Sequence, residues 1–145
     1  MTSINPAATN TAPGRRALPA WQAVTGAAAL AAVVNLIVLF IGDAAGASLV
    51  LELNGKPDEI GASDVIFMSI AAPVIGVTAV VLLARWKPVF LRVGQLVGGA
   101  VAVLTAIGPL TQDTDGGTAS TLITMHLFVG FVAVAALEVI RRSRV

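Results

Sequence analysis

The sequence predicts an all-α integral membrane protein whose four transmembrane helices form a bundle. The 145 residues are 57% hydrophobic and only 12% charged. That is about half the charged share of an average soluble domain. The charged residues are clustered, so four stretches long enough to cross a bilayer as helices are almost free of charge. Four spans and their loops take up nearly all of these residues, and we expect no separate soluble domain among them.

The first segment, residues 1–20, is rich in Ala, Thr, Asn and Pro. It has too little apolar surface to fold, so we interpret it as a disordered cytoplasmic tail. A first span follows at about residues 21–42. Ala45-Gly46-Ala47 resembles a signal-peptide cleavage site. The preceding apolar run, however, is longer than the roughly 7–15 residues of a signal-peptide core, so we expect this span to be retained.

Residues 43–63 form the longest loop and contain signals for a short β-hairpin. Residues 48–53 alternate in polarity, and Asn54-Gly55 is typical of a type I′ turn. Pro57 weakens the return strand because it lacks a backbone donor. A lone hairpin is marginal in stability, so it must rest on the bundle or the lipid surface. The side chains available for that contact are Leu49, Leu51 and Leu53.

Three further spans complete the predicted bundle. The second covers about residues 64–84, and Pro73 interrupts its backbone hydrogen bonds. The third covers about residues 89–110 and the fourth about 119–140. A basic cytoplasmic tail, residues 141–145, ends the chain.

Basic residues determine the predicted orientation. Lys56 is the only basic residue expected on one side of the membrane. By the positive-inside rule, the other side is cytoplasmic and holds both termini, and we expect a multi-pass protein of the cell membrane. The basic residues on the cytoplasmic side are Arg15, Arg16, Arg85, Lys87, Arg92, Arg141, Arg142 and Arg144. Seven of the eight acidic residues fall on the outer side: Asp43, Glu52, Asp58, Glu59, Asp64, Asp113 and Asp115.

Each predicted span carries a stripe of small residues, which is typical of helix faces that pack together in lipid. Each stripe also holds one polar residue: Asn35, Ser69, Thr105 or His126. At 1.5 Å rise per residue, all four lie roughly 8–12 Å below the outer end of their helices. We therefore infer one polar layer in which His126 meets the other three, with the loop of Asp113 and Asp115 above it.

Two interpretations of this layer remain open. Its hydrogen bonds could simply fix helix register, since such bonds contribute about 0.6 to 2 kcal/mol in membranes. Alternatively, the ionisable His126 marks a path for an ion, proton or ligand, with the outer acids concentrating cations. We expect no catalytic residue, metal site or cofactor. Haem ligation lacks a second histidine, a metal site would need the Asp113 loop to fold inward, and no oxyanion hole accompanies His126.

Several short segments resemble a family of small, uncharacterised four-helix membrane proteins common in actinobacteria. They are Asn35-Leu36-Ile37-Val38, Gly42 with Ala45-Gly46, Gly108-Pro109-Leu110, Thr118 with Leu122, and Met125-His126-Leu127. The resemblance covers about residues 22–137. It implies the same four-span topology and draws attention to Asn35, Pro109 and His126, but it implies no activity, substrate or cofactor.

Three functions compete on this basis, and the third, an enzyme or cofactor carrier, has the least support in the sequence. The first is a structural or interaction subunit of a membrane assembly, with the lipid bilayer and a second copy or another membrane protein as partners. The alternative is a small transporter or channel-like protein with an outward-facing polar site around His126. The net charge of +1 gives no reason to expect nucleic-acid binding.

Overall fold

The computed structural model describes residues 18–53 and 55–143. Most of the predicted N-terminal tail, together with Arg15, Arg16 and Arg144, lies outside them. The described part contains four helices long and apolar enough to cross a membrane. They are α1 (Ala20–Ala44), α2 (Ala62–Leu83), α3 (Val89–Ala106) and α4 (Gly116–Arg142). The predicted bundle of four membrane-length helices is confirmed.

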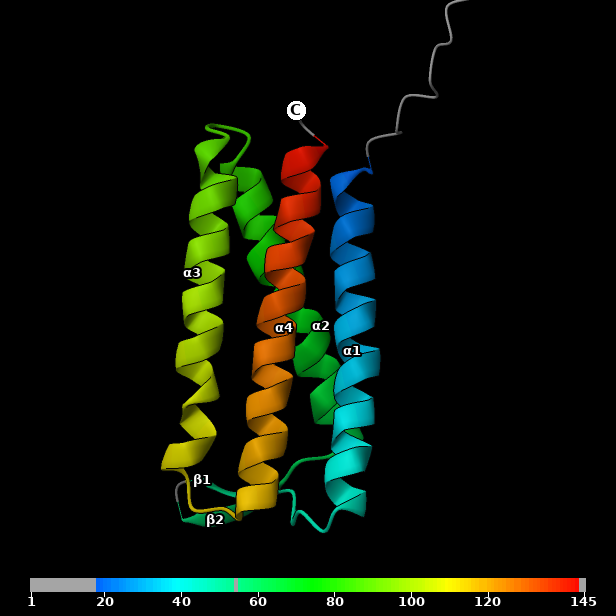
Figure 1. Cartoon of the computed structure of the whole chain (residues 1–145), viewed down its shortest axis with the longest axis vertical. Helices are drawn as coiled ribbons and strands as arrows, with labels where there is room; N and C mark the ends of the chain where they lie inside the picture. The colour runs from blue at the N-terminus through cyan, green and yellow to red at the C-terminus, as the bar shows by residue number, and fades with distance from the viewer. Residues whose placement is uncertain (1–17, 54, 144–145) are drawn as a thin grey trace, which may run out of the picture.

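The helices run up and down and pack unequally (Figure 1). α4 lies between α1 and α3 and packs closely on both, and α1 also packs closely on α2. α2 and α3 are joined by a short turn yet contact each other only sparsely. A short 3₁₀ helix, η1 (Gly108–Thr111), follows α3 and rests on α4.

The predicted hairpin is confirmed between α1 and α2. Strand β1 (Val50–Leu53) pairs antiparallel with β2 (Lys56–Glu59). Gly55 in the turn has a φ of 74°, which glycine adopts without strain. The hairpin lies across one end of the bundle (Figure 1). Leu49 is buried there and Leu51 packs on the same cluster, as predicted for both. The predicted contact of the Leu53 side chain lies outside what the structure describes.

Two buried clusters hold the bundle together. One contains side chains from all four helices, including Val24, Val77, Leu91 and Ile140. The other lies towards the hairpin and contains Leu39, Leu49, Val65, Leu122 and Met125. α3 contributes nothing to this second cluster. All four helices therefore contribute to the core near the α2–α3 turn, whereas only α1, α2 and α4 contribute helix side chains to the core near the hairpin.

Two glycines set the closest approaches of α3. A Cβ at Gly130 of α4 would collide with the Cβ of Ala102 on α3. A Cβ at Gly94 of α3 would lie 2.5 Å from Val80 Cγ1 on α2. Backbones in lipid approach this closely only where side chains are small. α3 is thus held against α4 midway along its length and against α2 only near the turn.

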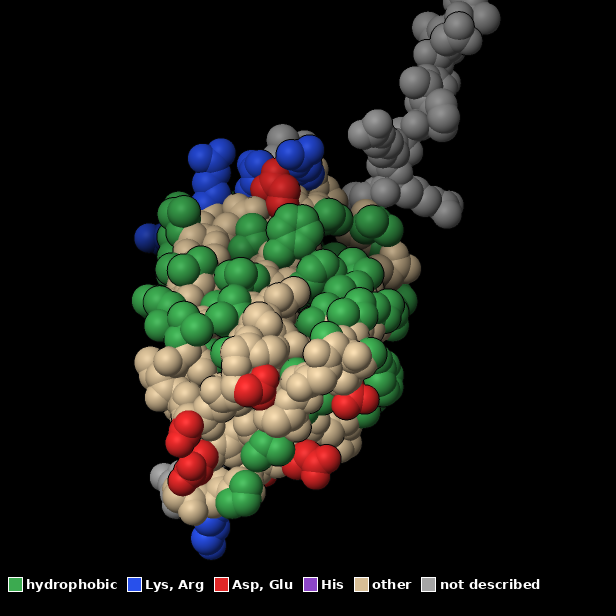
Figure 2. Space-filling view, turned by 60° about the horizontal axis from the view of Figure 1, so that its bottom comes forward, with side chains coloured by type: hydrophobic (Ala, Val, Ile, Leu, Met, Phe, Trp, Pro, Cys, Tyr) green, Lys and Arg blue, Asp and Glu red, His purple; other side chains and the backbone are tan. Residues whose placement is uncertain are grey.

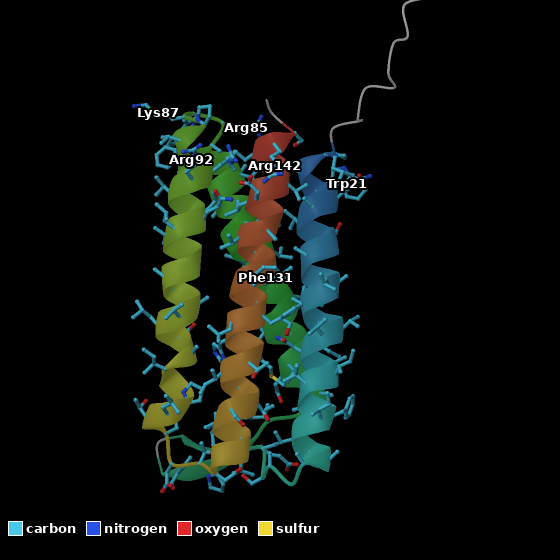
Figure 3. All side chains as sticks on the ribbon, in the orientation of Figure 1. Trp21, Arg85, Lys87, Arg92, Phe131 and Arg142 are labelled. Carbon is cyan, nitrogen blue, oxygen red and sulfur yellow. The ribbon has the colours of Figure 1, made fainter. Side chains whose placement is uncertain are left out.

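Charged side chains separate towards the two ends of the bundle. We call the end carrying Arg85, Lys87, Arg92 and Arg142 the basic end, and the opposite one the hairpin end (Figure 3). Arg141, beside Arg142 in the last turn of α4, belongs to the basic end too. Acidic side chains gather around the hairpin end, where Lys56 is the one described basic residue (Figure 2). Trp21 and Trp86 are exposed at the basic end, as expected for aromatic residues at a membrane interface.

Candidate ligand cavity between α2, α3 and α4

A cavity of about 620 Å³ occupies the space left where α2 and α3 separate. α4 forms its floor, and Asn35 of α1 also borders it. Its volume falls within the range of about 300–1,000 Å³ found for small-molecule sites. Met68 on α2 is 65% exposed and Val101 on α3 is 51% exposed, and both border the cavity. The cavity therefore opens sideways between the two helices, where lipid would lie.

The cavity is long and mostly apolar. It extends along α2 from Asp64 at the hairpin end to Val80, which is about 24 Å at 1.5 Å per residue. The close contact between Val80 and Gly94 narrows it there, and the four-helix cluster lies beyond. The cavity is therefore open along one side and closed at the basic end.

The structure brings all four predicted polar residues to this one cavity. The Asn35 side-chain nitrogen Nδ2 donates to the Ser69 hydroxyl at 2.9 Å and so links α1 to α2. Asn35 is only 2% exposed, and its oxygen Oδ1 has no hydrogen-bond partner among the described residues. Leaving a buried polar atom unpaired costs about 1–3 kcal/mol. The unpaired oxygen of Asn35 therefore lowers the stability of the fold, which argues against a purely structural role for this residue.

His126 and Thr105 do not complete the hydrogen-bonded layer that the sequence suggested. Nδ1 of His126 lies 2.8 Å from the Leu122 carbonyl of its own helix. A carbonyl only accepts, so Nδ1 carries a proton and Nε2 is the acceptor in the neutral ring. The Thr105 hydroxyl donates to the Val101 carbonyl at 2.8 Å. Both side chains border the cavity without bonding across it.

The small-residue stripes of α2 and α3 also differ from the prediction. The stripe of α1 is buried as expected, including Ala28, Ala31 and Gly42. A Cβ added at Gly76 or Gly98, by contrast, would meet nothing within 4 Å. Sequence periodicity identified the inward faces, but on α2 and α3 much of that face borders the open cavity instead of another helix.

The loop with Asp113 and Asp115 is not a lid above the polar residues. Asp115 caps α4 by accepting from the Thr118 amide at 3.0 Å, and it also accepts from the Ser48 amide at 3.1 Å and from the Ser48 and Thr118 hydroxyls. These hydrogen bonds, with that from the Ser48 hydroxyl the largest cause, hold the pKa of Asp115 well below its ordinary value. Asp113 is exposed, and neither acid borders the cavity. The loop instead attaches the segment between α1 and β1 to the start of α4.

Leu49 shows how firmly this attachment holds the backbone. Its φ is +53°, which a bulky residue rarely adopts. Its amide donates to the Thr118 hydroxyl at 2.8 Å, and its side chain is buried in the cluster near the hairpin. Thr114 adds a further bond from its hydroxyl to the Val50 carbonyl at 2.8 Å. The hairpin is therefore fixed across the end of the bundle by side chains from both sides of the α4 N-terminus.

Residues 15–143 match a family of unknown function, DUF6069. The chain belongs to the DUF6069 family. No curated protein and no solved structure matches it. Membership is consistent with the four-span resemblance seen in the sequence and assigns no activity, so functional inference for this DUF6069 protein rests on the cavity itself.

Two features of the DUF6069 chain were not predicted from the sequence. Gln95 of α3 donates to Glu138 at 2.9 Å, which joins α3 to the ion pairs that Glu138 forms with Arg141 and Arg142. This contact spans 43 residues, and no local pattern signals it. The second feature is Pro73, which the sequence identifies only as a helix interruption. It is buried and borders the cavity, and it lacks the N–H that would bond to the Ser69 carbonyl four residues earlier.

Proposed function

We propose that this DUF6069 protein binds a small amphipathic molecule that enters its cavity sideways from the lipid bilayer. The observation that carries the proposal is the cavity of about 620 Å³, lined mainly by apolar side chains, with the buried and half-paired Asn35 at its wall. A few placed polar groups in an apolar pocket are the usual form of a small-molecule site. The proposal develops the sequence-based alternative of a polar transport site around His126.

The test is to identify what the purified protein retains. We expect organic extracts of the wild type to contain a compound in near-stoichiometric amount that is absent from protein-free micelles. Filling the cavity with Gly76→Leu and Gly98→Leu should remove it, because both positions border the cavity and have free space. Gly26→Leu is the matched control: Gly26 is exposed on α1, has equal space and does not border the cavity. Equal retention by the filled variant would rule the proposal out.

The orientation of the protein in the membrane decides which leaflet supplies the ligand. We place both termini in the cytoplasm and the hairpin outside the cell membrane, supported by the five described basic residues at the basic end. In this orientation Asp64 and the polar residues Asn35, Ser69 and His126 lie towards the outer leaflet. A ligand would then be taken up from that leaflet.

A second candidate function is the structural or interaction subunit. Unopposed glycines at Gly76 and Gly98 favour it, since a helix of a second copy or of another membrane protein could pack there. Val97 borders the cavity and is 56% exposed, so Val97→Cys should form disulfides between copies if a second copy packs there. Val33→Cys, equally exposed on α1, is the control. Monomeric Val97→Cys protein under oxidation would exclude self-association at this face.

A further inference from the structure

We propose that the cavity selects a long-chain molecule with a hydroxyl end over one with an anionic end, with the hydroxyl placed between Asn35, Ser69 and His126. This inference rests on the proposed function and adds the chemical class of the ligand. It follows from the polar atoms that border the cavity, from the charges that border it and from its shape.

Two buried polar groups just behind the cavity wall provide an acceptor and a donor for a ligand hydroxyl. Asn35 Oδ1 is an acceptor without a partner among the described residues. The Ser69 hydroxyl accepts from Asn35 Nδ2, so its own proton remains available to donate. A ligand hydroxyl can both donate and accept, and it therefore matches this pair in either orientation of the Asn35 amide.

His126 adds a second acceptor at the same cavity. Nδ1 of His126 is engaged by the Leu122 carbonyl, which leaves Nε2 without a partner in the described part of the chain. The residues bordering the cavity thus include two unpaired acceptors, Asn35 Oδ1 and His126 Nε2, and these favour a ligand that carries a proton to donate.

The charge of the lining argues against an anionic ligand. None of the described residues that border the cavity is a Lys or Arg, and the one charged residue among them is Asp64. The carboxylate of Asp64 accepts from the Gly61 amide at 3.1 Å at the hairpin end. A carboxylate or phosphate end group would enter an apolar site with no counter-charge and with Asp64 at its hairpin end, which is unfavourable in a membrane.

The shape of the cavity suits a single chain. From Ser69, the space continues along α2 to Val80, about 16 Å further at 1.5 Å per residue. Its walls there are apolar or small, including Val77, Gly98 and Val129. A hydroxyl at the polar residues therefore leaves an apolar tail pointing towards the basic end, where the four-helix cluster stops it.

Photolabelling in nanodiscs tests this with three matched competitors. A diazirine-labelled dodecanol is cross-linked to the full-length protein, and labelled residues are mapped by mass spectrometry. We expect saturable labelling on α2, α3 and α4 at the cavity, competed by unlabelled dodecanol. Tridecane, which lacks the hydroxyl, should compete about tenfold more weakly, as one lost hydrogen bond predicts. Dodecanoate should compete more weakly still.

Two variants separate failure of the ligand class from failure of the site. Asn35→Leu with Ser69→Ala should abolish the preference for dodecanol over tridecane while cavity labelling remains. The filled variant with Gly76→Leu and Gly98→Leu should lose cavity labelling altogether, and Gly26→Leu should keep it.

The contrary results are equally distinct. Cavity labelling competed equally by all three compounds would overturn the hydroxyl selectivity and leave the proposed function standing. No saturable labelling in the cavity would overturn both. Absent labelling together with disulfides between copies at Val97→Cys would assign the cavity to a second copy of the chain.

Discussion

The Asp115 side chain accepts more hydrogen bonds than any other described side chain near the hairpin. These hydrogen bonds join segments that are far apart in the sequence. It accepts from Ser48 before the hairpin and from Thr118 at the start of α4. We predict that Asp115→Ala lowers the midpoint of thermal unfolding in detergent by several degrees, because α4 loses its cap and the hairpin loses its attachment. Asp113→Ala, two residues away and exposed, should leave the midpoint unchanged. Equal effects of both variants would mean that the cap contributes nothing.

The same carboxylate gives a prediction for pH. Its pKa is held below the ordinary value of 3.8, so the folded protein binds fewer protons at this site than the unfolded chain. The stabilisation is therefore fully present above pH 3.8 and is lost as pH falls towards the folded pKa. We expect the difference in unfolding midpoint between wild type and Asp115→Ala to be constant at neutral pH and to shrink below about pH 4. A difference that grows on acidification would show that these hydrogen bonds do not favour the charged carboxylate.

Asn35 and Ser69 allow packing and function to be told apart by stability alone. Ser69→Ala by itself leaves both polar atoms of the Asn35 amide unpaired, so it should destabilise the protein by about 1–3 kcal/mol. Adding Asn35→Leu removes the unpaired amide, and we expect the double variant to be within about 0.6 kcal/mol of wild type or more stable. Unfolding of all three proteins in one detergent measures this. If the double variant is the least stable, the pair is structural.

The chemistry of single residues could be predicted only in part. Their depth followed from helix rise, and Asn35, Ser69, Thr105 and His126 do border one cavity. Their partners did not follow, because a rotamer decides whether a hydroxyl or imidazole bonds to its own backbone or to a neighbour. Thr105 and His126 both bond to their own helix. The cap at Asp115 could have been predicted, because Asp directly before a helix is a strong signal for an N-cap. The prediction for this loop considered only its negative charge.

At the scale of helices, the contact of α3 with α4 depends on Gly130. We predict that Gly130→Ala destabilises the protein by about 1–3 kcal/mol, because the added methyl collides with Ala102 and must push the helices apart. Gly98→Ala on α3 makes the same chemical change where nothing lies within 4 Å, and it should be neutral or slightly stabilising. Unfolding midpoints of the two variants decide it. A harmless Gly130→Ala would show that α3 moves freely against α4.

The helices themselves were predictable because lipid allows few alternatives. A charge-free run of spanning length must be helical, and the breaks at the Arg85 turn and at Gly108-Pro109 follow from charge and backbone chemistry. The sequence did not predict that α2 and α3 would be the neighbouring helices that separate from each other. Small residues recur on α2 and α3 as they do on α1, and sequence cannot distinguish a face that packs on protein from one that borders a cavity.

For the whole molecule, the two ends of the bundle differ both in charge and in packing. The basic end is closed by a cluster from all four helices, whereas the hairpin end leaves α3 out of its core. The cavity therefore has a direction along the bundle, and the side of the membrane that it serves depends on how the protein inserts. Basic residues bias that choice far more than acidic ones do.

The chain has no cysteine, so single substitutions can report its orientation without background. We predict that Asp58→Cys in β2 reacts with a membrane-impermeant maleimide on intact cells, because in the proposed orientation the hairpin end faces outward. Trp86→Cys at the basic end should react only after the cells are permeabilised. Both positions are exposed, and neither substitution removes a Lys or Arg, so the charge bias that directs insertion is preserved. The reverse pattern would place the polar residues of the cavity on the cytoplasmic side and make the inner leaflet the source of its ligand.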